Sequence, residues 1–405
     1  MQLSGRSRPL IEATLPAVGE HIGEIAERFY RRLFTVHPEL LDGTFNRGNQ
    51  AQGLQQQALA GSVAAFAGAL VNSPRRLPEN LLARVAHKHA SLGIQPDQYQ
   101  VVHDNLMWAI ADVLGDAMTP DIAAAWDEVY WHMADALVRM ERGLYSARAI
   151  TPQTVWRPWE VEQKIPETAD VVTFVVKRAD DRLIKPSLPG QYITVQVALP
   201  DGTRQPRQYS LSHADNGKYR QFTVKRVHGG GNPDGEVSTL LHDTVNVGDV
   251  LSLSVPSGDV VLDDYRGRPM VFASAGIGIT PMAGMLSHLV KAGSRLPVTL
   301  LHADLNEDCF ALRGQVLGDI AALPGARAYV WYEQGSVSRL PVQGAFQGEM
   351  DLSQVSLPDN ALFYLCGPIP FMHAVHTALT AKYGVAARDI QYEVFGPDLW
   401  HADYD

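Results

Sequence analysis

The chain has few cysteines and no long apolar run. These two features argue against a disulfide-stabilised protein and against a membrane-spanning protein. Only Cys309 and Cys366 occur in 405 residues, far apart in sequence, so we expect no disulfide framework and a reducing environment. No apolar run reaches the length of a membrane span, and the first residues lack the apolar core of a signal peptide. We therefore expect a cytoplasmic protein with no obligatory membrane partner.

Positive charge is also scarce. The net charge is −10, and no basic run interleaved with aromatic residues occurs, so we expect no nucleic-acid partner. The chain has 14 histidines but neither an HExxH nor a CxxC motif, which argues against a zinc site. A hydrophobic share of 46% and a charged share of 19% are typical of a globular protein, and 405 residues are too many for a single core.

The sequence predicts three domains of different fold class. Residues 1–148 carry apolar side chains at helical spacing and predict an all-α domain. Thr151-Pro152 and Arg157-Pro158 then mark a linker. Residues 149–266 contain short β-branched runs separated by glycine turns, as in an antiparallel β-barrel. Residues 267–405 alternate strands with helices, which predicts an α/β domain with a parallel sheet.

One histidine of the helical domain stands out. Leu81, Val85 and His89 follow one another at i, i+4 and i+8 on an apolar stripe, whereas His87 falls on its flank. A buried imidazole needs a partner, because an unpaired polar ring is costly inside a core. The residues alone leave open whether that partner is a metal or cofactor, or only a backbone carbonyl.

A glutamate raises the same question. Glu141 continues the stripe that Tyr130, Met133 and Leu137 form on a later helix. Burying a carboxylate without a partner costs several kcal/mol, so Glu141 requires a donor unless its helix end reaches water. Tyr30 is a comparable case on an earlier helix, since its phenol lies among apolar side chains and could be purely structural.

Two turns of the last domain suit a nucleotide. Gly276-Ile277-Gly278-Ile279-Thr280-Pro281 stands between an apolar strand and an apolar helix, and Cys366-Gly367-Pro368 follows another strand. Glycines let a backbone approach a pyrophosphate, and a helix N-terminus offers it free N–H groups. The first turn lacks the third glycine of the dinucleotide fingerprint, so an ordinary strand-to-helix turn is the alternative.

A short run in the barrel domain combines three chemistries. Arg207-Gln208-Tyr209-Ser210 supplies a cation, a flat ring and a hydroxyl. On an extended strand Arg207 and Tyr209 share a face. Arginine suits a phosphate and tyrosine can cover a planar ring, although a half-exposed barrel strand would have the same pattern.

Together with the terminal Glu393-Val394-Phe395-Gly396-Pro397, these motifs resemble the ferredoxin-NADP reductase type of flavin module. With the helical domain included, residues 10 to 400 resemble the flavohemoglobins, the bacterial and fungal nitric oxide dioxygenases. The resemblance implies haem b, FAD and NADH or NADPH as cofactors. It also implies that electrons pass from NAD(P)H through FAD to the haem iron, where NO and O2 are converted to nitrate.

The resemblance also implies roles for individual residues. Arg207 would hold the FAD pyrophosphate, Tyr209 would cover the isoalloxazine, and Ser210 would face its N5. The other implied FAD positions are Tyr192, Gln208, Gly235, Val237 and Ser238. The implied nucleotide positions are Gly276, Ile277, Gly278, Ile279, Thr280, Pro281, Cys366, Gly367, Pro368, Glu393, Val394, Phe395, Gly396 and Pro397, with Phe395 at the flavin face.

In the helical domain the resemblance implies a haem site. His89 would be the proximal iron ligand. Lys88, Tyr99 and Glu141 would form its proximal network, with Glu141 accepting a hydrogen bond from the far nitrogen of His89, directly or through Tyr99. On the other side Tyr30 and Gln55 would bind O2, and Phe45 would pack on the porphyrin.

The chain departs from NADPH-selective relatives after the second strand of the last domain. Asp304, Glu307 and Asp308 would repel a 2′-phosphate there, so we expect a preference for NADH. Two other functions remain open at this point. One is a gas-binding or sensing globin with an attached haem reductase, and the other is a lipid hydroperoxide reductase that admits lipid to an apolar distal pocket.

Overall fold

A computed structural model of the chain describes residues 2–45, 47, 54–72, 78–229, 234–262, 267–335 and 341–396. Contacts divide it into two compact units. The helical unit comprises residues 1–156, 196–207 and 396–404, and the sheet unit comprises residues 157–195, 208–395 and 405. The predicted domain boundaries at residues 148 and 266 stay predictions. Residues 196–207 cluster with the helices.

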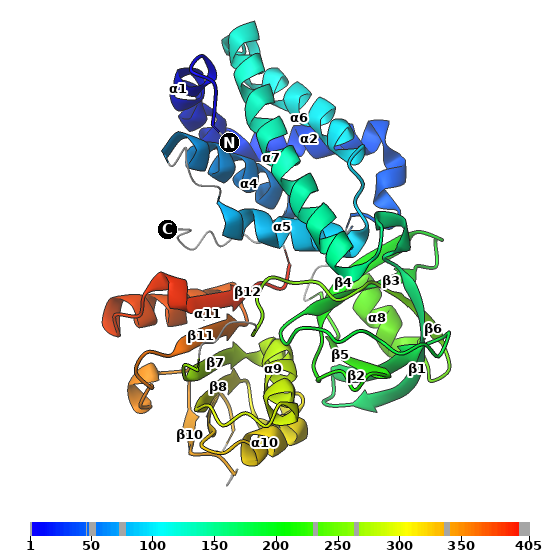
Figure 1. Ribbon diagram of the computed structural model, residues 1–405, viewed down its shortest axis with the longest axis vertical. Coiled ribbons are helices and arrows are strands. Elements are labelled where there is room, and N and C mark those ends of the chain that lie inside the picture. Colours follow the sequence, from blue (N-terminus) through cyan, green and yellow to red (C-terminus); the bar gives the residue numbers. More distant parts are fainter. Residues whose placement is uncertain are drawn as a thin grey trace. The chain divides into compact units, whose positions relative to one another are not determined.

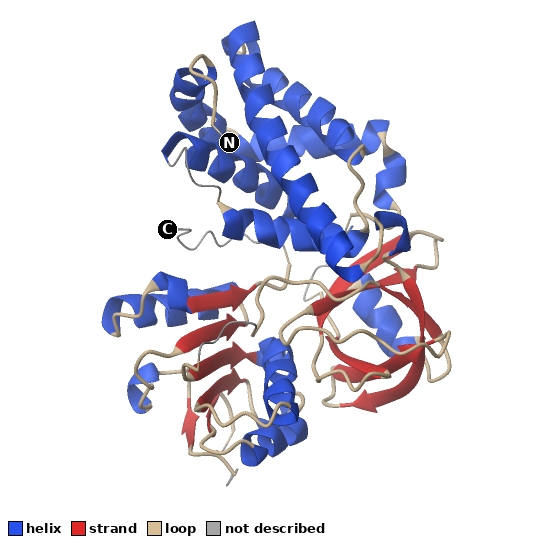
Figure 2. Cartoon of the chain, in the orientation of Figure 1, coloured by secondary structure: helices blue, strands red, loops and turns tan. Residues whose placement is uncertain are grey.

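Helices build the first part of the helical unit (Figures 1 and 2). They are α1 (Ser7–Glu20), α2 (Ile22–Val36), α4 (Leu54–Asn72), α5 (Glu79–Leu92), α6 (Gln98–Leu114) and α7 (Pro120–Arg148). Ile25, Phe29 and Leu33 of α2 are buried at the predicted helical spacing. The helix ends before Pro38, because the residue preceding a proline is disfavoured in helical geometry.

Helix α5 carries His89, and the face that it buries is wider than the predicted stripe. Leu82 and Ala86 are fully buried and Ala90 nearly so, whereas the His89 side chain is 30% exposed. Leu81 is also buried and Val85 packs against the core, so the predicted stripe does face the core. The His89 ring lies at the less buried end of this stripe. This position keeps one side of the imidazole open.

Antiparallel strands form the middle part of the chain. They are β1 (Arg157–Pro166), β2 (Val171–Arg178), β3 (Tyr192–Ala198), β4 (Arg204–Ser210), β5 (Tyr219–Lys225) and β6 (Val250–Leu253). Among the described residues the sheet order is β4-β3-β6-β1-β2-β5, and a bridge between Leu211 and Phe222 connects its two outer strands. This arrangement confirms the predicted antiparallel barrel.

One boundary was wrongly predicted. Arg157-Pro158 is not linker, because Arg157 already pairs with Leu253 and Pro158 with Ser252 in the barrel sheet. Proline is tolerated there because it lies in the first positions of the strand. The connection itself is a short 3₁₀ turn, Pro152–Thr154, in which Thr151 and Thr154 cap each other.

The last part of the chain is a parallel sheet with helices, which confirms the predicted α/β fold (Figure 1). Its strands are β7 (Met270–Ala275), β8 (Val298–Asp304), β9 (Arg327–Tyr332), β10 (Gly344–Gln347), β11 (Leu362–Cys366) and β12 (Ile390–Glu393), and its helices are α9 (Ile279–Lys291), α10 (Arg313–Ala322) and α11 (Ile369–Thr377). The described strands follow the order β10-β9-β8-β7-β11-β12. The order reverses between β7 and β11, where ligands bind in such sheets.

Helix α9 of the parallel sheet packs closely on the chain that follows β4. A Cβ added to Gly284 would lie 2.1 Å from the carbonyl oxygen of Leu211. The Ser287 hydroxyl accepts a hydrogen bond from the Ala214 N–H at 3.2 Å, and the Gln315 amide donates to the Ser212 carbonyl at 2.7 Å. The two halves of the sheet unit therefore meet through backbone groups.

No described helix is both long and apolar enough to span a bilayer.

Candidate functional site

His89, Tyr99 and Glu141 form one hydrogen-bonded group from three helices. The Nδ1 atom of His89 lies 2.8 Å from Glu141 Oε1 and 2.9 Å from the Tyr99 hydroxyl, and that hydroxyl donates to the same carboxylate oxygen at 2.5 Å. A carboxylate only accepts, so the proton belongs on Nδ1 and the lone pair on Nε2. The group therefore fixes Nδ1 as the donor nitrogen and leaves Nε2 as the nitrogen available to a metal ion.

Burial makes the carboxylate a strong acceptor. The Glu141 side chain is only 3% exposed, and two donors compensate its desolvation. Burial, followed by the neighbouring Glu141 charge, raises the pKa of Tyr99 far above its usual range. Tyr99 thus stays protonated and remains a donor. The Tyr130 hydroxyl donates to the Tyr99 carbonyl at 2.6 Å and fixes the backbone behind this group.

The proximal side fits a haem by its donor set. The Nδ1 atom of His89 is committed to Glu141 and Tyr99, while the ring is partly open to its surroundings. Metal-bound histidines commonly donate their other N–H to a carboxylate, which orients the ring. Helix α5 ends at Gly93, whose φ of +78° only glycine adopts easily, and an added Cβ would lie 2.6 Å from the Pro152 carbonyl.

Aromatic rings gather around Tyr30. Its ring lies 5.6 Å from Phe34, in a stacked arrangement, and 6.0 Å from Phe45, edge to face. Tyr30 itself is 3% exposed, which matches the predicted buried phenol. Gln55 belongs to α4, but its side chain lies outside the described residues. Tyr30 and Phe45 thus come together in space, as a haem-pocket role requires of them, and Gln55 stays a prediction.

Strand β4 positions the predicted flavin residues. Ser210 is 5% exposed, and the Tyr209 ring stacks on Phe222 at 5.7 Å. The Gln208 amide donates to Thr194 at 3.4 Å, and Arg207 donates to the Pro206 carbonyl at 2.7 Å. Because side chains alternate along a strand, Arg207 and Tyr209 share one face of β4.

The predicted phosphate turn begins helix α8 (Glu236–Asp243). An added Cβ at Gly235 would lie 2.7 Å from the Ser238 hydroxyl and 2.8 Å from Val227 Cβ, so a side chain here would displace one of them. That hydroxyl donates to the Gly235 carbonyl at 3.0 Å and accepts from the Val227 N–H at 3.1 Å. The Ser238 side chain therefore holds the turn, and backbone N–H groups such as that of Val237 are the better phosphate donors.

Three predicted nucleotide segments meet at the carboxyl ends of neighbouring strands of the parallel sheet. Ser274 pairs with Cys366, and Cys366 pairs with Glu393. A Cβ on Gly278 would lie 2.2 Å from the Cys366 carbonyl, so the two glycine turns touch. The space around Gly276 is open within 4 Å of an added Cβ, as a cradle for a phosphate requires.

The C-terminal aromatic residue lies next to these strand ends. Phe395 follows β12 and is 47% exposed, whereas Val394 is nearly buried. Pro397 lies outside the described residues. Helix α9 begins at Ile279, so Pro281 is its third residue and not its first, as the sequence predicted; a 3₁₀ turn over Gly276–Gly278 precedes it. The first turn still tolerates a proline, because its N–H groups lack intrahelical acceptors.

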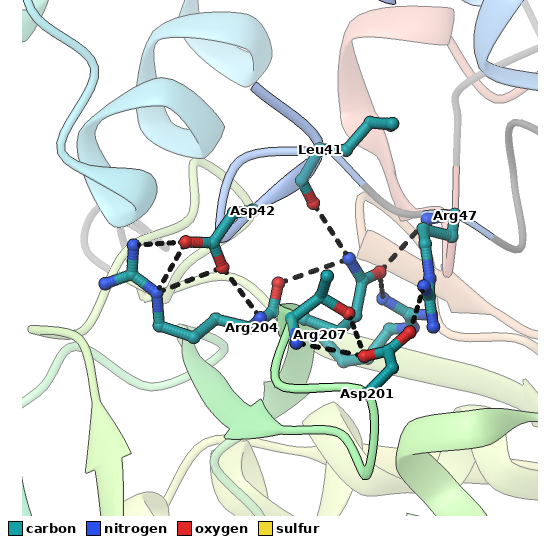
Figure 3. A network of polar contacts seen from close by, with 8 residues as sticks. Leu41, Asp42, Arg47, Asp201, Arg204 and Arg207 are labelled. Carbon is teal, nitrogen blue, oxygen red and sulfur yellow. Dashed lines mark hydrogen bonds and ion pairs between the residues drawn. The ribbon is translucent and has the colours of Figure 1, made fainter. Parts of the chain in front are cut away.

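Sequence reasoning missed one polar network in the helical unit (Figure 3). Its centre is Gln205, which is fully buried and contacts the segment around Phe45. The network also contains the ion pairs Asp42–Arg204 and Arg47–Asp201. The residue types give no signal by themselves, because the partners are separated by more than 150 positions in the chain.

The fold and these sites define a class: a globin-type helical domain in one chain with a flavin- and nucleotide-binding reductase. Family models agree with this class. Residues 27–137 match the globin family, residues 158–262 the oxidoreductase FAD-binding domain, and residues 272–377 the oxidoreductase NAD-binding domain.

Full-length relatives identify the family. A flavohemoprotein of Bordetella parapertussis is 41% identical over 402 residues, with 97% of this chain and 98% of the relative covered. A flavohemoglobin from Malassezia yamatoensis, solved with bound FAD and heme, has a TM-score of 0.88 at 36% identity and covers 98% of this chain and 100% of its own. The FAD/NAD-binding domain of a nitric oxide dioxygenase from Vibrio cholerae is 40% identical, covering 60% of this chain and 99% of its own, with a TM-score of 0.55.

The chain belongs to the flavohemoprotein family. This confirms the predicted family, its fold classes, and its cofactor set of haem, FAD and NAD.

Proposed function

We propose that this chain is a nitric oxide dioxygenase that takes electrons from NADH and converts NO and O2 to nitrate. The observation that carries the proposal is the His89–Glu141–Tyr99 group in a chain that is similar to flavohemoproteins over its full length. When bound, the haem supplies oxygen chemistry at its iron, and FAD converts a hydride into single electrons.

On the proximal side His89 is the proposed iron ligand through Nε2. Its Nδ1–H donates to Glu141, which makes the imidazole more basic and increases its electron donation to the metal. Tyr99 donates to the same carboxylate and holds it in place. Lys88 is the proposed neighbour of the cofactor on the same helix.

On the distal side Tyr30 and Gln55 are the proposed hydrogen-bond donors to O2, and Phe45 packs on the porphyrin. The aromatic rings around Tyr30 support a pocket that excludes water. The same rings could border an acyl chain, so lipid in the distal pocket and lipid hydroperoxide reduction stay a second prediction.

In the reductase the proposed flavin residues are Arg207, Tyr209 and Ser210. The proposed nucleotide site lies at the carboxyl ends of β7 and β11, beside Gly276 and Cys366. The Asp304 side chain is 7% exposed at the carboxyl end of β8, and its Oδ2 has no hydrogen-bond partner among the described residues. Its Oδ1 accepts from the Leu305 N–H at 2.8 Å, and its Oδ2 lies 3.5 Å from His302 Nε2. A carboxylate at this strand end supports a preference for NADH, because it would repel a 2′-phosphate. Glu307 contributes less than the sequence suggested, since it is ion-paired with Arg313 at 2.5 Å.

The proposed function is tested with purified holoenzyme, limiting NADH, and excess NO and O2. NADH supplies two electrons and each NO requires one, so two nitrates should form for each NADH oxidised. Binding of NO without turnover would support the sensing globin instead, and turnover of a lipid hydroperoxide at a higher kcat/KM would support the peroxide reductase. The cofactor preference is wrong if NADPH gives a higher kcat/KM than NADH.

The proposed location of the protein is the cytoplasm. Cys309 and Cys366 are both free thiols, which supports a reducing cytoplasm.

A further inference from the structure

Gln205 is a buried amide whose hydrogen-bonding groups are all used. Its side-chain oxygen accepts from the Arg47 N–H at 3.1 Å and from Arg207 Nη1 at 3.4 Å. Its amide nitrogen donates to the carbonyls of Leu41 and Arg204, both at 3.1 Å. Because the residue is 0% exposed, losing any of these bonds would leave a buried polar group unpaired.

Further contacts join the same two segments, as Figure 3 shows. The Arg204 guanidinium contacts both carboxylate oxygens of Asp42, with Nη2–Oδ2 at 2.8 Å, and the Arg204 N–H donates to Asp42 Oδ1 at 2.7 Å. These bonds hold the pKa of Asp42 below its usual range. Arg47 pairs with Asp201 at 2.6 Å. The Gly43 N–H donates to the Arg204 carbonyl at 2.8 Å.

Each segment continues into a proposed cofactor site. The first, residues 41–45 and 47, which we call the Phe45 loop, carries Phe45; that ring lies 5.2 Å from Phe34 and 6.0 Å from Tyr30. The second is the hairpin of residues 196–207, which ends at Arg207, two residues before Tyr209. Gln205 therefore bonds to the loop of the proposed haem pocket and to the guanidinium of the proposed flavin strand.

We propose that Gln205 and the Asp42–Arg204 pair are positioning residues for electron transfer from flavin to haem. They tie the Phe45 loop to the strand that carries Arg207, so that the segments bearing the two proposed sites keep one geometry. This inference rests on the proposed roles of Phe45 and Arg207. It adds residues that contact neither reacting atoms nor substrate and act through their neighbours.

Two features favour a positioning role over simple surface pairing. A single exposed ion pair contributes little to stability, but here two pairs flank a buried amide that is saturated with bonds. The bonds to Gly43, Arg47 and Leu41 involve main-chain atoms, so they fix the backbone path of the loop as well as its side chains. Small misplacements of reacting groups can cost about 10²-fold in rate.

The test follows the two electron-transfer steps separately in anaerobic holoenzyme loaded with haem and saturating FAD. After mixing with NADH, flavin absorbance reports the first step and haem absorbance reports the second. We expect Asp42→Arg, Arg204→Asp and Gln205→Glu to slow haem reduction by about tenfold or more and to leave flavin reduction unchanged. Gln205→Glu keeps the side-chain shape but removes both donors. The charge-swapped double variant, Asp42→Arg with Arg204→Asp, should regain much of the rate.

The matched control is Arg6→Asp, which removes an exposed ion pair with Asp121 elsewhere in the helical unit. A readout independent of turnover is backbone hydrogen exchange in the cofactor-free protein, which should accelerate at Gly43 and Arg47 in each single variant. Unchanged haem reduction in all three variants overturns the inference. So does an equal slowing of flavin reduction, or an equal effect of Arg6→Asp. Because the test uses neither NO nor O2, failure of the dioxygenase proposal leaves its outcome unaffected.

Discussion

His89 and Glu141 are 52 positions apart in the chain, yet His89 Nδ1 lies 2.8 Å from Glu141 Oε1. The contact needs two helices, α5 and α7, to bring one residue each to the same point, with Tyr99 of α6 as the third member. The two donors compensate the burial of the Glu141 carboxylate, and the contact orients the His89 ring.

Replacing Glu141 by Gln should weaken electron donation by His89. The neutral amide keeps the shape but removes the charge that polarises Nδ1–H, and loss of such an outer partner typically costs about 10- to 100-fold in activity. We expect a lower iron–histidine stretching frequency in resonance Raman spectra and slower NO consumption. Asp135→Asn, on the exposed side of the same helix, is the control and should change neither.

Replacing His89 by Ala should abolish haem-dependent NO consumption, because the proposed iron ligand is lost. NADH reduction of an artificial flavin acceptor should continue, since the sheet unit is untouched. His87→Ala is the matched control, two residues away on the same helix. If His87→Ala removes the haem absorption band and His89→Ala does not, the assignment of the ligand is wrong.

Replacing Tyr30 by Phe should speed the dissociation of O2 from the reduced protein. The ring and its contacts with Phe34 and Phe45 remain, so the change isolates the hydroxyl. The off-rate is measured by displacing O2 with carbon monoxide after rapid mixing. Tyr383→Phe, at a surface tyrosine, is the control and should leave the off-rate unchanged. An unchanged off-rate would exclude Tyr30 from the distal role.

Replacing Asp319 by Asn should stabilise the sheet unit at neutral pH. Burial raises the pKa of Asp319 to about 6, and one of its carboxylate oxygens has no partner among the described residues. The folded state thus holds the Asp319 proton more tightly than the unfolded chain does. The contribution of this group to stability is therefore fully present below about pH 4 and is lost as the pH rises through about 6. The amide avoids that loss.

We therefore expect the Asp319→Asn variant to melt a few degrees higher than the parent at neutral pH and at about the same temperature near pH 4. Differential scanning calorimetry at both pH values measures this. Asp359→Asn, at an exposed aspartate of the same sheet unit, is the control. An equal gain at both pH values would show that burial of the charge is not its cause.

Much of the fold could be predicted because its signals are local. The apolar spacing of α2 and the β-branched runs of β2 and β3 are visible within short windows. Burial in α2 follows the helical spacing, whereas β2 and β3 are each buried over four consecutive residues. Strand β1 was partly mistaken for linker because Pro158 lies at its start, and only pairing with β6 makes it a strand. The choice of His89 over His87 was likewise local, whereas its exposure depends on how α5 rotates against its neighbours.

The rest of the site depends on contacts between distant residues. Gln205 precedes the Arg207–Ser210 run, but nothing in that run indicates its partners Leu41 and Arg47, which lie 164 and 158 positions away. A glutamine at a barrel strand looks like ordinary surface until the fold buries it. The engagement of the Ser238 hydroxyl with Gly235 and Val227 also depends on the shape of a turn that residue types do not specify.

The close approach of Gly284 to Leu211 limits how reductases of this kind can exchange parts. Helix α9 meets the chain after β4 with no space for even a methyl group. A nucleotide module borrowed from another enzyme would fit this barrel only if it brings a residue without a side chain to the same place.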